Sequence, residues 1–90
     1  MRFAVKLTIS GTVQGVNYRY SAMQQAIRTQ VFGWVKNTNT GDVEAYAEGE
    51  KNAVESFIAW CKKGPDHAEV TQVKVEEVTP GNFTEFTIIR

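Results

Sequence analysis

The first ten residues alternate between apolar and polar or small side chains. The apolar ones stand at every second position, at Phe3, Val5, Leu7 and Ile9. A period of two is typical of a strand that buries one face. We therefore expect a first strand here, followed by a loop over residues 11–17, where two glycines interrupt the pattern.

Two later stretches have the spacing of amphipathic helices. In residues 18–30 the apolar positions are Tyr18, Ala22, Met23, Ala26 and Ile27, and Ser21 with Gln24 matches a capping box. In the second stretch the positions that follow the i, i+3, i+4, i+7 rule are Val54, Phe57, Ile58 and Cys61. Gly64 and Pro65 then end the pattern.

The remaining segments are rich in residues that favour strands. Residues 32–37 and 43–48 predict two strands joined by a hairpin, with Gly41 suited to its turn. Valines mark a fourth strand over residues 70–78, and a slip in their phase between Val70 and Val73 indicates a bulge or a late start. A turn at residues 79–82 leads to a last short strand over 83–89.

This order of elements predicts an α+β fold. It is a ferredoxin-like βαββαβ sandwich, in which two helices cover one face of an antiparallel sheet, with a short C-terminal strand added. Right-handed crossovers make the first two strands parallel and place the third between them. The loop after the first strand, Asn37 at the end of the second and the connection 64–69 should then meet at one edge of the sheet.

Length, charge and cysteine content limit the classes of function that this chain can have. Ninety residues, of which 42% are apolar, predict one domain over residues 1–90. Ten basic residues balance ten acidic ones, so no overall positive field draws the chain to nucleic acid. Cys61 is the only cysteine, which excludes an internal disulfide and a cysteine-rich zinc site. No segment approaches the roughly 18 apolar residues of a membrane span, so we expect a cytoplasmic protein without a membrane partner.

The loop over residues 11–17 has the features of an anion site. It runs into a helix start, where free backbone N–H groups and the helix dipole attract negative charge. Gly11 and Gly15 would let the backbone wrap closely around a phosphate, and the Arg19 fork would add paired hydrogen bonds. Ordinary turn chemistry explains two glycines equally well, so both interpretations stay open at this point. The spacing fits neither a Walker A loop nor a dinucleotide fingerprint.

Two motifs carry a resemblance to a known family. Residues 11–19 read Gly-Thr-Val-Gln-Gly-Val-Asn-Tyr-Arg, which resembles the first signature of the acylphosphatase family, G-x-V-Q-G-V-x-aromatic-R. Residues 33–37 read Gly-Trp-Val-Lys-Asn and, with Gly41, Val43 and Gly49, resemble the second. The likeness continues to Gly64-Pro65 and to residues 86–88, and so covers essentially the whole chain.

The chain departs from this family pattern at four positions. The family usually has Arg at the position of Thr12, Gly or an aromatic residue at Asn17, Phe at Tyr18, and often Asp at Thr40. We expect these differences to leave the anion cradle intact and to bear on substrate affinity or loop stiffness.

The resemblance implies hydrolysis of small carboxyl phosphates, such as acetyl phosphate, to a carboxylate and inorganic phosphate. It implies that Arg19 and Asn37 are catalytic: the Arg19 guanidinium binds the phosphate, and the neutral Asn37 amide orients the attacking water. The backbone amides that bind the phosphate are those of Gln14, Gly15, Val16, Asn17, Tyr18 and Arg19. No cofactor or metal is implied, and we expect a monomer.

Other reactive side chains have simpler explanations. His67 fits an exposed loop histidine, and Cys61 fits the apolar stripe of the second helix. Glu48, Glu50 and Glu55 form no closed set of metal ligands. The aromatic residues Trp34, Tyr46 and Trp60 fit packing positions.

Two alternatives to catalysis remain. The first is a non-catalytic anion-binding or regulatory module on the same fold, because a fold does not fix a function. Such a module would not need the amide of Asn37. The second is RNA binding, but residues 42–48 are acidic and lack the aromatic motif that RNA-recognition sheets carry on their third strand.

Overall fold

The computed structural model describes residues 2–89. Its elements follow the order β1 (Phe3–Thr12), α1 (Tyr18–Thr29), β2 (Phe32–Asn37), β3 (Val43–Gly49), α2 (Lys51–Lys63), β4 (Glu69–Val78) and β5 (Phe86–Ile89). The predicted α+β order is therefore confirmed. Neither α1 nor α2 is long and apolar enough to cross a membrane.

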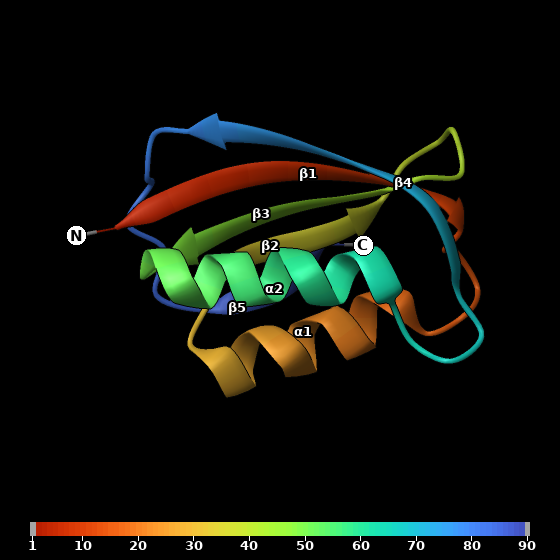
Figure 1. Cartoon of the computed structure of the whole chain (residues 1–90), viewed down its shortest axis with the longest axis horizontal. Helices are drawn as coiled ribbons and strands as arrows, with labels where there is room; N and C mark the ends of the chain where they lie inside the picture. The colour runs from red at the N-terminus through yellow and green to blue at the C-terminus, as the bar shows by residue number, and fades with distance from the viewer. Residues whose placement is uncertain (1, 90) are drawn as a thin grey trace.

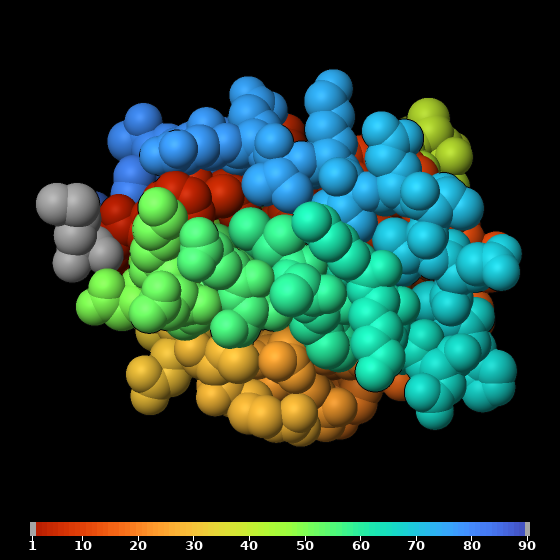
Figure 2. Space-filling model, in the orientation of Figure 1, coloured from red at the N-terminus to blue at the C-terminus, as the bar shows by residue number. Residues whose placement is uncertain are grey.

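The five strands form one sheet in the order β4-β1-β3-β2-β5. β3 lies between β1 and β2, as right-handed crossovers predict, and both helices lie on one face of the sheet (Figure 1). In the space-filling view α2, in green, lies above α1, in orange, on this face (Figure 2).

The short C-terminal strand pairs in a direction that the sequence left open. β1, β2, β3 and β4 pair antiparallel, but β5 pairs parallel to β2. The reason is that β4 and β5 occupy opposite edges, so residues 79–85 must cross the end of the sheet before the chain turns back. This crossing also delays β5, which begins at Phe86 and not at Phe83.

The core lies between the sheet and the helices. The alternating apolar residues of β1 point into it, together with most of the helix positions that the spacing predicted. The buried ones are Val5, Leu7, Ile9, Tyr18, Ala22, Ala26, Val54, Phe57 and Cys61. Met23 and Ile58 are only partly buried, and Ile27, which the spacing also placed on the apolar side, is 61% exposed. Burial raises the pKa of the Cys61 thiol to about 12. This cysteine is therefore a core residue, as predicted.

The predicted irregularity of β4 is confirmed, and it changes the role of Gly11. Ser10 pairs with Gln72 but Gly11 pairs with Val70, so one residue of β4 is extra. Gly11 has a φ of 126°, and a Cβ there would collide with the carbonyl oxygen of Glu69. Gly11 therefore permits close approach of two strands, and the expectation that it helps to wrap a phosphate is wrong. β1 extends to Thr12, which leaves residues 13–17 as the loop.

The predicted capping box at Ser21 and Gln24 is also wrong. α1 begins at Tyr18, with Asn17 as its N-cap, and no side chain caps the helix. The Ser21 N–H donates to the Asn17 carbonyl at 3.2 Å, so Ser21 already lies inside the first turn. Gln24 Nε2 donates to the Tyr20 hydroxyl at 3.1 Å. The first backbone N–H groups of α1 are therefore left without a side-chain cap.

Candidate active site

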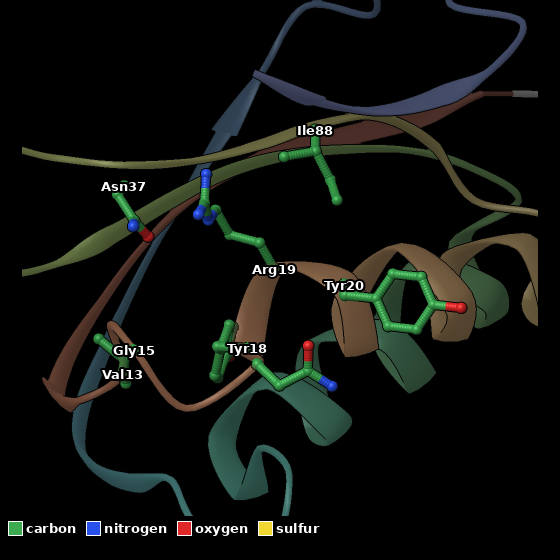
Figure 3. A pocket seen from close by; sticks show the side chains of 8 residues that line it. Val13, Gly15, Tyr18, Arg19, Tyr20, Asn37 and Ile88 are labelled. Atoms are coloured by element: carbon green, nitrogen blue, oxygen red, sulfur yellow. The ribbon is translucent and has the colours of Figure 1, made fainter. Parts of the chain in front are cut away.

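Three segments that are distant in sequence meet at one edge of the sheet. The loop 13–17, the first turn of α1 and the end of β2 surround a cavity of about 300 Å³, to which β5 adds a wall (Figure 3). The residues that line it are Val13, Gly15, Asn17, Tyr18, Arg19, Tyr20, Asn37 and Ile88. The shared edge that the topology predicted is therefore confirmed. The connection 64–68 reaches the same edge, because Thr12 pairs with Glu69.

The loop curves because two of its residues have left-handed backbone conformations. Gly15 has a φ of 77°, and nothing lies within 4 Å of a Cβ built there, so conformation and not space favours glycine. Asn17 has a φ of 66° and a ψ of 25°, a conformation that asparagine tolerates better than most residues. Such a concave run of backbone, next to the free N–H groups of a helix start, suits an anion.

Arg19 is half-buried and extends across the cavity. Its guanidinium points toward Asn37 (Figure 3). Within residues 2–89 the guanidinium makes no hydrogen bond or ion pair with another side chain or with the backbone. Its charge and its donors are therefore available to a ligand in the cavity.

Asn37 ends β2 with an unsatisfied polar atom. Its side-chain Oδ1 is buried and accepts no hydrogen bond from the described part of the chain. A buried acceptor without a donor costs about 1–3 kcal/mol, and such atoms are rare in folded proteins. The atom faces a cavity that also contains a free guanidinium, which indicates a functional reason for this cost.

Gln14 has a side-chain role that its place in the sequence motif does not reveal. Its Nε2 donates to the carbonyl oxygens of Thr38 at 2.9 Å and of Asp42 at 2.7 Å. The loop is thereby tied to the β2–β3 hairpin, one residue beyond Asn37. Gln14 and Val16 do not line the cavity, whereas Gly15, Asn17, Tyr18, Arg19 and Asn37 do. The roles predicted for the backbone amides remain predictions.

The structure accommodates the departures from the family pattern. The Tyr18 ring is buried, and its hydroxyl donates to the Cys61 carbonyl at 2.8 Å. Burial, together with the contact with Cys61, raises the pKa of this hydroxyl, which stays protonated. Thr12 is the last residue of β1. The Thr40 hydroxyl lies 2.9 Å from that of Thr38 in the hairpin.

Sequence reasoning did not single out Tyr20 or Ile88, which also line the cavity. The sequence feature that could have indicated Tyr20 is that it directly follows Arg19. Ile88 reaches the site only because β5 runs parallel to β2, a pairing that the sequence did not predict.

The remaining candidate residues lie elsewhere. His67 is exposed in the connection after α2 and does not line the cavity. Across residues 2–89, no three His, Cys, Asp or Glu side chains gather in a way that could hold a metal ion. Trp34 stacks on Tyr46 with ring centroids 6.3 Å apart, and Tyr46 packs against Phe83 at 4.8 Å.

A concave loop at a helix start, beside a free guanidinium and a buried amide, suits a protein that binds a phosphate group, and comparison with known proteins identifies the family. The sequence model of the Acylphosphatase family matches residues 5–88. The chain therefore belongs to the acylphosphatase family, whose function is the hydrolysis of acyl phosphates.

Individual relatives agree with this assignment. The chain is 49% identical over 86 residues to an acylphosphatase of Acaryochloris marina, a match that covers 96% of this chain and 92% of the relative. It is similar to the crystal structure of acylphosphatase from Bacillus subtilis, with a TM-score of 0.95 and 35% identity over 100% of both chains. An acylphosphatase structure from Coxiella burnetii gives a TM-score of 0.94 at 36% identity, covering 98% of this chain and 93% of that one.

Proposed function

We propose that this chain hydrolyses small carboxyl phosphates in the cavity between the loop 13–17 and Asn37, by in-line attack of water and without a metal. The unpartnered Oδ1 of Asn37, facing the free guanidinium of Arg19, is the observation that carries the proposal. Hydrolysis of acyl phosphates is the reaction of the family, and the Asn37 amide and the Arg19 guanidinium are the two side-chain groups that we propose carry it out.

The reaction needs the protein mainly to position the reactants and to stabilise the negative charge of the phosphoryl group. The leaving group is a carboxylate whose parent acid has a pKa of about 4, so no general acid has to protonate it. The site must hold the phosphoryl group, stabilise its charge and place a water in line with the breaking bond. None of these tasks needs a histidine, a thiolate or a pair of carboxylates.

In the proposed mechanism, Arg19 and the loop 13–17 hold the phosphoryl group. The backbone amides of residues 14–19 face the phosphate oxygens, and the guanidinium donates two more hydrogen bonds. Each charge-assisted bond contributes roughly 1.5–3 kcal/mol, so loss of the arginine should cost about two to four decades in rate.

Asn37 places the nucleophile. Its amide is neutral and cannot remove a proton, but its Oδ1 can accept a hydrogen bond from water and fix the direction of the oxygen lone pair. The water oxygen bonds to phosphorus while the phosphorus–oxygen bond to the acyl group breaks. The bond pair leaves with the carboxylate, and the proton of the water passes to a phosphate oxygen. The products are a carboxylate and inorganic phosphate.

Phosphate release from benzoyl and acetyl phosphate, measured with a chelator present, tests this proposal. We expect the native chain to be active, Arg19→Ala to lose about two to four decades in kcat/KM, and Arg28→Ala to match the native chain. Arg28 is the control because it is exposed in the last turn of the same helix. No hydrolysis by the native chain, activity that disappears with the chelator, or equal loss in both variants would contradict the proposal.

The main alternative is a module that binds anions without turnover. It would use the same loop, but it gives no reason for a buried, unpaired acceptor at Asn37. Phosphate binding without hydrolysis would favour it. Our proposal also includes a single domain over residues 1–90 that acts in the cytoplasm as a monomer, with no nucleic-acid or membrane partner.

A further inference from the structure

The cavity has a second side that the binding of phosphate does not use. Asn37 and Gly15 lie to one side of the Arg19 side chain, and Tyr20 and Ile88 lie to the other (Figure 3). The volume of about 300 Å³ would hold roughly ten water molecules at liquid density, which is more than a phosphate fills. Part of this space is therefore available for the rest of the substrate.

In-line chemistry determines which part of the substrate lies on that side. The attacking water and the leaving oxygen stand on opposite faces of phosphorus. With the water held at Asn37, the carboxylate and its acyl group must leave away from Asn37. In Figure 3 Tyr20 and Ile88 lie on the other side of the Arg19 side chain from Asn37, where such a group would find them.

The wall formed by these two residues is apolar and partly fixed. The Tyr20 side chain is 48% exposed, so its ring has surface left to bury against a ligand. Gln24, one turn later on α1, donates to the Tyr20 hydroxyl at 3.1 Å and limits the positions of the ring. Ile88 is half-buried on β5. Among the described lining residues Arg19 alone is charged, and the phosphoryl group already uses it.

We infer that Tyr20 and Ile88 form a subsite for an uncharged, apolar acyl group, so that the chain prefers aryl or branched acyl phosphates. Acetyl phosphate is too short to cover the ring. An acyl group that carries a second phosphate would find no second cation on this wall. This inference rests on the proposed hydrolysis and adds to it a class of substrate.

The selectivity between benzoyl and acetyl phosphate, taken as the ratio of their kcat/KM values, tests the subsite. Their different chemical reactivities cancel when each variant is compared with the native chain. We expect Tyr20→Ala to lower this ratio about tenfold, because the benzoyl ring loses its contact surface. Tyr20→Phe keeps the ring and should retain the native ratio.

Ile27→Ala is the matched control. Ile27 is also an exposed apolar residue of α1, at 61%, but it does not line this cavity, so its variant should keep the native ratio. Because both side chains are largely outside the core, both variants should melt near the native temperature. An unchanged ratio in Tyr20→Ala, or an equal fall in Ile27→Ala, would overturn the subsite while leaving the hydrolysis intact. Failure of the native chain to hydrolyse either substrate would instead overturn the proposed function.

Discussion

Two side-chain amides, one lining the cavity and one behind its loop, differ in their hydrogen bonds. The amide of Asn37 keeps a buried oxygen without a donor, whereas the amide of Gln14 uses its donor group on two carbonyls of the neighbouring hairpin. We propose that the first accepts a hydrogen bond from a ligand, whereas the second ties the loop to the hairpin that follows Asn37. Because both side chains end in the same carboxamide group, their different hydrogen bonding results from their positions in the fold.

Replacing the Gln14 side chain should loosen this tie. We expect Gln14→Ala to lower the free energy of unfolding by about 1–3 kcal/mol, since two partly buried hydrogen bonds are lost. Gln14→Glu has the same size but presents an acceptor to two carbonyl oxygens, so it should be at least as destabilising. Urea denaturation measures both values. A stable Gln14→Glu protein would show that shape alone, and not donation, holds the loop.

The sequence could predict that Arg19 and Asn37 lie at one site, but not the hydrogen bonds of the Gln14 side chain. The first two stand in motifs whose chemistry is local, a guanidinium at a helix start and an amide at a strand end. Gln14 acts on backbone carbonyls 24 and 28 residues away. Every residue has such a carbonyl, so no residue type in the sequence marks the partner.

At the scale of elements, α1 and α2 are joined where one begins and the other ends. The Tyr18 hydroxyl donates to the carbonyl of Cys61, which lies in the last turn of α2. Carbonyls in the last turn of a helix lack partners within the helix, so this bond satisfies a group that the fold would otherwise bury unpaired. The hydroxyl that departs from the family pattern thus stabilises the helix layer.

We expect Tyr18→Phe to remove this bond and to keep the ring in the core. The free energy of unfolding should fall by about 0.5–1.5 kcal/mol, the usual net value of one hydrogen bond. The KM for acyl phosphates should stay near the native value, because the hydroxyl points to α2 and not into the cavity. Thermal or urea unfolding beside a kinetic assay checks both statements. A large rise in KM with native stability would contradict this role.

The elements that the sequence predicted best are those with a strong periodicity of apolar residues. Alternation in β1 and the apolar stripe of α2 survive into the structure because burial on one face decides their form. α1 begins at Tyr18, where the apolar spacing predicted it, but the left-handed Asn17 is its N-cap and the residue types at Ser21 and Gln24 wrongly indicated a capping box. The parallel β5 could not be predicted because its pairing depends on how residues 79–85 cross the sheet.

At the scale of the whole molecule, a buried carboxylate holds three distant segments together. Glu48 of β3 is fully buried, and it accepts hydrogen bonds from Arg2 at 2.8 Å, from the Tyr46 hydroxyl at 2.7 Å and from the Gly81 N–H at 2.8 Å. The alternation of β3 places this residue on the polar face of the sheet. It is buried because the connection 79–85 covers that face, which sequence reasoning did not foresee.

This cluster should make stability depend on pH. Burial alone would raise the pKa of Glu48, but the hydrogen bonds from Tyr46 and Gly81 and the charge of Arg2 outweigh it, so the pKa lies below the ordinary 4.5. A lowered pKa in the folded state means that the ionised carboxylate stabilises the fold above pH 4.5. This contribution disappears as the pH falls through the lowered pKa.

Glu48→Gln should isolate this effect. We expect the variant to be less stable than the native chain near neutral pH, and the difference in unfolding free energy to shrink as the pH falls below 4.5. Urea denaturation of both proteins across this range measures it. A difference that stays constant with pH would show that the lost packing, and not the charge, destabilises the variant.

We propose that the Asn37 amide places the attacking water while other groups hold the phosphate. Asn37→Ala separates these tasks when kcat for benzoyl phosphate and the dissociation constant for inorganic phosphate are measured on the same protein. Asn39→Ala, at an exposed position in the adjoining hairpin, is the control. We predict that Asn37→Ala lowers kcat by about a thousandfold or more, with phosphate affinity within about twofold of native. Equal losses of turnover and phosphate affinity, or near-native turnover, would contradict the account.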